Sequence, residues 1–129
     1  MFENSAAYSG MSMRDTAEAR AFYEGVLGLS VRDAEMQGIL IIELASGGVV
    51  LLYPKGDQHV PASFTVLNFP VDDVDGAVDE LGARGIEMLR YEGMHQDEKG
   101  ISRGKAAGMG PDIAWFTDPS GNILSVHSA

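Results

Sequence analysis

The pattern that most constrains this chain is a repeat: a strand, a helix that ends at a glycine, and then three strands occur twice in the same order. Period-two alternation of apolar residues indicates strands, and a capping aspartate before an apolar stripe indicates a helix. The strand-like segments lie at 8–14, 30–34, 39–45, 49–53, 64–71, 86–91, 113–117 and 123–127. The helices begin at Asp15 and at Asp72 and Asp73, and end at Gly28 and Gly85.

Eight short strands with two helices predict an α+β fold of two β-α-β-β-β modules, each a curved sheet with its helix outside. We expect a single domain over residues 1–129, with a first module at 6–55, a linker at 56–62 and a second module at 63–129. Two such sheets can enclose a cup, and small-molecule pockets favour concave interfaces of this kind. The sequence therefore predicts a ligand site in a cup between the modules.

Composition excludes several classes of protein. The absence of cysteine rules out disulfides and thiolate catalysis and suits a reducing cytoplasm, where we expect the protein to be. A formal net charge of −10 argues against nucleic acid as a partner. The longest apolar runs are too short to cross a membrane, and the first residues lack the basic and apolar regions of a signal peptide.

Three segments carry a resemblance to a known family: 14–29, 66–87 and 113–126, the last containing the turn sequence DPSGN. In this order and spacing they resemble the vicinal oxygen chelate superfamily, which includes glyoxalase I, bleomycin-resistance proteins, fosfomycin-resistance enzymes and extradiol dioxygenases. The resemblance implies a cup-shaped mixed sheet with helices outside. It also implies a homodimer.

Enzymes of that family hold a divalent metal with His, Glu or Gln at four strand positions, where the metal polarises substrate oxygens. The resemblance places these positions at Tyr8, Leu51, Val66 and Ser125. Divalent ions prefer carboxylate oxygen or imidazole nitrogen, which none of the four side chains offers. We therefore expect no metal and no other cofactor, and leave open whether the chain is an enzyme.

Strand parity predicts which side chains would line the cup. They are Tyr8, Ser12, Leu51, Tyr53, Val66, Asn68, Trp115, Ser125 and His127. The aromatic members would suit stacking on a planar or apolar ligand, or would fill the cup as a core. His127 is a candidate catalytic base, the alternative being a solvated chain end.

The segment 92–111 is a long loop that is rich in glycine, and such loops in compact domains are usually functional or disordered. It could be a lid, a dimer contact or a mobile loop. As a lid it would bring His95, Lys99, Arg103 and Lys105 to the site, where its cations would face an anionic ligand. We expect His59, in the linker, to be solvated.

Three functions remain open. The first hypothesis is a metal-independent binding protein for a small hydrophobic or aromatic molecule. The alternative is a metal-dependent lyase, isomerase or dioxygenase-like enzyme that uses displaced ligands such as His127 or His95. The third is a structural module whose cup is filled by its own side chains.

Overall fold

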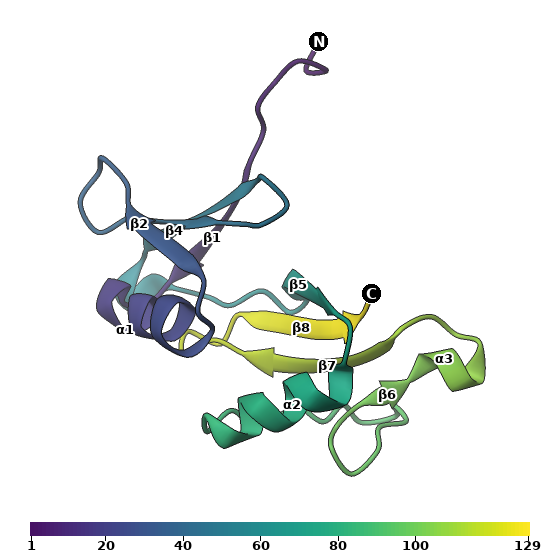
Figure 1. The fold of residues 1–129 in the computed structure, drawn as a ribbon. Helices are drawn as coiled ribbons and strands as arrows, with labels where there is room; N and C mark the ends of the chain where they lie inside the picture. Colours follow the sequence, from purple (N-terminus) through teal and green to yellow (C-terminus); the bar gives the residue numbers. More distant parts are fainter. The chain divides into compact units, whose positions relative to one another are not determined.

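The computed structural model describes residues 1–129, which form two compact units, 1–61 and 62–129. Each unit holds a four-stranded mixed sheet with helices, and the two sheets repeat one strand order (Figure 1). The duplication predicted from the sequence is therefore confirmed at the level of topology. No helix has the length and apolar character needed to cross a membrane.

In the first unit the strands follow the order β1-β4-β3-β2, with β1 parallel to β4 and the other pairs antiparallel. The elements are β1 (Ser9–Met13), α1 (Thr16–Arg20), η1 (Ala21–Val26), β2 (Ser30–Asp33), β3 (Leu40–Glu43) and β4 (Val49–Pro54). A short 3-10 helix, η2 (Gly56–Gln58), follows in the segment expected to be the linker.

The first helix begins where the sequence predicted but changes its winding. The Asp15 carboxylate accepts a hydrogen bond from the backbone N–H of Glu18 at 2.8 Å, which caps the helix start. From Ala21 the helix continues as a π-helix, a rare and wider winding. Phe22 and Tyr23 are both buried there, with their rings edge to face at 5.1 Å.

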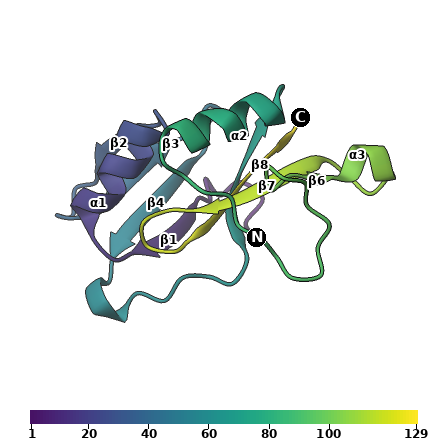
Figure 2. The same ribbon diagram turned by 90° about the horizontal axis from the view of Figure 1, so that it is seen from below.

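In the second unit the order is β5-β8-β7-β6, with β5 parallel to β8 and the other pairs antiparallel. The elements are β5 (Thr65–Val71), α2 (Val74–Ala83), β6 (Ser102–Arg103), α3 (Gly104–Ala107), β7 (Asp112–Thr117) and β8 (Ile123–Ser128). Asp73 caps α2 by accepting the N–H of Gly76, as expected of the acidic pair there. Helix α2 packs along β7 and β8 on one face of the sheet (Figures 1 and 2).

The strand expected at 86–91 does not form, and the two-residue β6 takes its place beside β7. Side-chain hydrogen bonds occupy the backbone groups that a strand would use for pairing. Gln96 accepts from the N–H of Tyr91 and donates to the carbonyl of Leu89. The segment keeps one backbone bond to the sheet, from the N–H of Leu89 to the carbonyl of Trp115 at 2.7 Å.

Each sheet has one face of buried apolar side chains, and alternation along the strands decides which residues it carries. The buried face of the first sheet carries Met11, Met13, Val31, Leu40, Ile42, Val50 and Leu52. That of the second carries Ala114, Phe116, Leu124 and Val126, with Val74 and Val78 of α2 also buried. Burying a side chain of this kind stabilises the fold by about 1.5–3 kcal/mol. The opposite faces carry the polar and aromatic side chains expected to line a site.

Candidate ligand pocket

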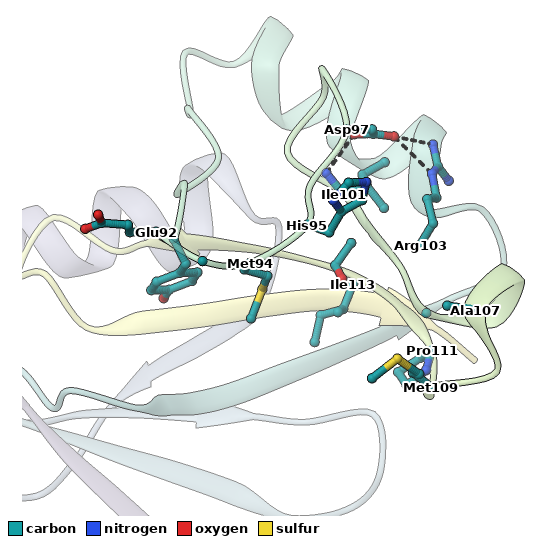
Figure 3. A pocket seen from close by; sticks show the side chains of 14 residues that line it. Glu92, Met94, His95, Asp97, Ile101, Arg103, Ala107, Met109, Pro111 and Ile113 are labelled. Atoms are coloured by element: carbon teal, nitrogen blue, oxygen red, sulfur yellow. Dashed lines mark hydrogen bonds and ion pairs between the residues drawn. The ribbon is translucent and has the colours of Figure 1, made fainter.

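A pocket of about 910 Å³ opens in the second unit, between the loop that begins at Tyr91 and strand β7 (Figure 3). Its volume falls in the range of small-molecule sites. Most of its lining is apolar, contributed by Tyr91, Met94, Ile101, Met109, Pro111 and Ile113. Figure 3 shows Met94 and Ile113 in the middle of the pocket, and Met109 and Pro111 at the end beside α3.

An aromatic pair adjoins the pocket. The ring of Tyr91 meets the indole of Trp115 edge to face, with centroids 5.3 Å apart. Trp115 lies on β7 directly opposite Ser125 of β8, on the sheet face turned away from the buried core. The pocket and this sheet face thus share the Tyr91–Trp115 contact.

Gln96 organises the irregular loop that forms the pocket wall. Besides its bonds to Tyr91 and Leu89, its amide nitrogen donates to the carbonyl of Gly100 at 2.8 Å. Arg90 donates to the carbonyls of Asp97 and Glu98. The loop therefore has an internal hydrogen-bonded structure, although it contains little regular secondary structure.

A cluster of ion pairs joins the loop to α2, and we call these five residues the clamp: Asp75, Asp79, Asp97, Lys99 and Arg103. Arg103 donates to both carboxylate oxygens of Asp75 at 2.7 and 2.9 Å, and to Asp97 at 3.0 Å. Lys99 pairs with Asp79 at 3.0 Å and approaches Asp75 at 3.5 Å. The clamp thus bridges the pocket wall and the solvent side of the helix.

The clamp shifts the titration of its members. The hydrogen bond from Arg103 lowers the pKa of Asp75 from its usual 3.8 to about 2. Burial alone would raise the pKa of Asp97, but hydrogen bonds from the Ile101 N–H and from Arg103 lower it. The hydrogen bonds to Asp75 and Asp97 raise the pKa of Arg103, and the bond to Asp79 raises the pKa of Lys99.

Two of the loop cations are therefore neutralised within the protein. Lys99 and Arg103 face carboxylates, whereas in a lid they would have presented their charges to an anionic ligand. Lys105 is exposed and does not line the pocket, whereas His95 does. The pattern of charges along a sequence cannot reveal such pairing, because Asp75 lies 28 residues before Arg103.

In the second unit, register aligns most of the predicted site residues on one face. Asn68, Ser125 and Trp115 lie opposite one another across β5, β8 and β7, and His127 is the next residue of β8 on the same face. The buried Ser125 hydroxyl donates to the Asn68 side-chain oxygen at 2.5 Å. His127 Nδ1 lies 2.8 Å from the carbonyl of its neighbour Ser128. Val66 falls at an irregularity in β5.

In the first unit, Ser12 and Tyr53 are register partners, and Leu51 follows on the same face opposite Gly10. Tyr8 precedes β1 and is 64% exposed. The Ser12 hydroxyl lies 2.7 Å from His59 Nδ1, and this histidine is half-buried. The expectation of a solvated linker histidine is therefore wrong, because η2 returns the chain towards β1.

The residues present do not fit a resident divalent metal. Leu51 and Val66 have no donor atom, and the Ser125 hydroxyl is bonded to Asn68. No three His, Asp or Glu side chains of the chain are grouped so that they could hold a metal ion. A divalent ion needs several oxygen or imidazole ligands together.

A family model for the Glyoxalase/Bleomycin resistance protein/Dioxygenase superfamily matches residues 7–126. A search of curated proteins finds no match.

Solved structures share the fold at low sequence identity. An integron cassette protein from the mobile metagenome of the Halifax Harbour sewage outfall has a TM-score of 0.70 at 12% identity, covering 95% of this chain and 98% of its own. A glyoxalase family protein from Enterococcus faecalis has a TM-score of 0.68 at 21% identity, covering 99% of this chain and 100% of its own. The fosfomycin resistance protein FosX from Listeria monocytogenes has a TM-score of 0.66 at 12% identity, covering 95% of this chain and 91% of its own.

Proposed function

Since the chain belongs to the glyoxalase/bleomycin resistance protein/dioxygenase superfamily, we propose that it is a metal-independent member that binds a small hydrophobic or aromatic molecule. One observation carries the proposal: the second unit has a largely apolar pocket of about 910 Å³. The four positions at which the resemblance places metal ligands hold Tyr8, Leu51, Val66 and Ser125, which supports binding without a metal. We also propose a homodimer, from the resemblance, and a cytoplasmic location, from the absence of cysteine.

The lining favours a flat, apolar ligand. Met94 and Met109 are flexible and polarisable, so they can adapt to the outline of a ring. Tyr91 supplies an aromatic ring to the lining, and the edge-to-face contact with Trp115 holds that ring. Lys99 and Arg103 are already paired, so a neutral or cationic ligand suits the site better than an anion.

The single tryptophan gives a direct assay, because Trp115 contacts a residue of the pocket lining. Titration of its fluorescence with a panel of neutral aromatic compounds should give a saturable change with at least one of them. Met94→Asp should abolish that change by placing a charge in the pocket. Met36→Asp is the matched control, because Met36 is also an exposed methionine but lies in the first unit.

A fluorescence response that saturates equally in both aspartate variants would place the ligand elsewhere. No response to any compound would refute the proposed function. Metal dependence is tested separately, by metal analysis of tag-free protein and by thermal melts with divalent ions. A ligand at a hundred times its Kd stabilises a fold by about 2.7 kcal/mol, which such melts detect. Stoichiometric metal that is lost in His95→Ala or His127→Ala would favour a lyase, isomerase or dioxygenase-like enzyme.

A further inference from the structure

The wall of the pocket is mostly irregular chain, and backbone bonds to β7 hold it only at its ends, at Leu89 and at β6. Between Tyr91 and Ile101 the loop forms no strand or helix, and Gln96 and Arg90 bind it only to its own neighbourhood. The clamp supplies a connection to a regular element, because Asp75 and Asp79 lie one turn apart on α2.

We propose that Arg103 is a positioning residue which holds the pocket wall against α2 and so sets how tightly the pocket binds its ligand. The part of this proposal that concerns ligand affinity rests on the proposed function. The planar guanidinium suits this task, since its fork binds one carboxylate at two points and still presents a third N–H group. Arg103 uses the fork for Asp75 on the helix and the third N–H for Asp97 in the loop.

Asp97 relays this restraint to the lining of the pocket. One of its oxygens accepts the N–H groups of Lys99 and Ile101, at 3.0 and 2.9 Å, while the other accepts from Arg103. Ile101 lines the pocket and is fully buried. A displacement of Asp97 therefore displaces Ile101, and Arg103 acts on the pocket by this route as well as through its own place in the lining.

The proposal predicts an unusual salt dependence. Arg103 and Asp75 are 37% and 45% exposed, so their attraction is screened as the Debye length falls from about 10 Å at 0.1 M salt to about 3 Å at 1 M. A neutral ligand in a rigid apolar pocket has no charge for salt to screen. Here salt should weaken the binding of a neutral ligand, because the clamp carries the charge.

The experiment compares Arg103→Met with Arg32→Met, which removes a similarly exposed Arg–Glu pair from the first unit. The probe is N-phenylnaphthylamine, a neutral fluorescent aromatic. Arg103→Met should raise its Kd about fivefold, in line with the modest strength of exposed ion pairs, and Arg32→Met should leave it unchanged. Arg103→Lys should fall between wild type and Arg103→Met, since an ammonium cannot reproduce the fork.

Hydrogen exchange measured without ligand separates the clamp from the proposed function. The amides of Lys99 and Ile101 should exchange about fivefold faster in Arg103→Met, and in wild type at 1 M NaCl. Unchanged exchange would overturn the inference whether or not the probe binds. Faster exchange with an unchanged Kd would also overturn it, while leaving the proposed function intact. If the wild-type protein does not bind the probe, both the predicted effect of Arg103 on affinity and the proposed function are refuted.

Discussion

Ser125 and Asn68 should contribute unequally to stability, although they share one hydrogen bond. The Ser125 hydroxyl is fully buried, whereas Asn68 is an exposed residue. Asn68→Leu keeps a side chain of similar shape over the hydroxyl but removes its acceptor. An unsatisfied buried polar group costs about 1–3 kcal/mol. Ser125→Ala removes the buried hydroxyl itself, and the exposed Asn68 amide can then bind water. We therefore expect the free energy of unfolding to fall by less than about 1 kcal/mol.

The double variant sharpens the prediction. When Ser125 is already replaced by alanine, Asn68→Leu leaves no buried hydroxyl without an acceptor. The double variant should therefore lose less free energy of unfolding than Asn68→Leu alone. Thermal and urea unfolding followed by far-UV circular dichroism would measure these differences. At roughly 3–5 °C per kcal/mol for a chain of this length, the Asn68→Leu effect is several degrees.

Two results would refute this reasoning: a larger loss for Ser125→Ala than for Asn68→Leu, or strict additivity in the double variant. The outcome also bears on function, because the resemblance places a metal ligand at Ser125. If Ser125→Ala instead weakens ligand binding and leaves stability unchanged, the hydroxyl serves the ligand and not the sheet.

Three further predictions follow from single contacts. Asp118→Ala should cost about 3 kcal/mol or more in unfolding experiments, because its buried carboxylate accepts three hydrogen bonds in the turn before β8. Gly104→Ala should lower probe affinity and stability by about 1–3 kcal/mol, since its Cβ would stand 2.4 Å from the Pro111 carbonyl oxygen. Gly82→Ala, with open space around it, should not destabilise the protein. Because the folded pKa of Asp75 lies at about 2, below its usual 3.8, its stabilising effect is present above pH 3.8 and is lost as the pH falls through 2. Between pH 3.8 and pH 2 the stability of Asp75→Asn should fall less steeply than that of the wild-type protein, as measured by acid unfolding.

The parts of the fold that local chemistry determines could be predicted from the sequence. Asp15 and Asp73 cap helices in the structure as a capping aspartate should, each accepting an N–H three residues on. The turn at Asp118 forms from the side chain of that one aspartate and its near neighbours. In each case both partners lie within a few residues, so the sequence itself contains the interaction.

The segment 86–91 could not be assigned correctly by the same means. Alternation of apolar residues indicates that a strand can form, but pairing also requires that the segment's own backbone groups stay free for a neighbouring strand. Here Gln96 takes those of Tyr91 and Leu89. Nor could the contact of Ser12 with His59 be anticipated, since it joins residues 47 positions apart.

The candidate pocket was predictable only in part: His95 and Arg103 of the loop line it, but none of the side chains expected to line the cup does. Strand parity placed Asn68, Ser125 and Trp115 on one face, as the register shows, because a period of two fixes the face of every residue in a strand. The apolar lining in the loop was missed, although Met94 and Met109 stand out as large apolar residues in a glycine-rich segment. Parity has no meaning in irregular chain, so only the structure could show which loop side chains meet.

The structure suggests how a pocket without metal ligands could bind a small molecule with useful affinity. Such a site depends on apolar contact, and ordering a flexible loop around the ligand would offset much of that gain. Gln96 and the clamp order the loop before any ligand is present, so that entropic cost falls on folding and not on binding. Asp75, Asp79 and Lys99 lie outside the lining, so mutations at these three clamp residues should weaken binding through a more mobile wall and not through a lost contact to the ligand.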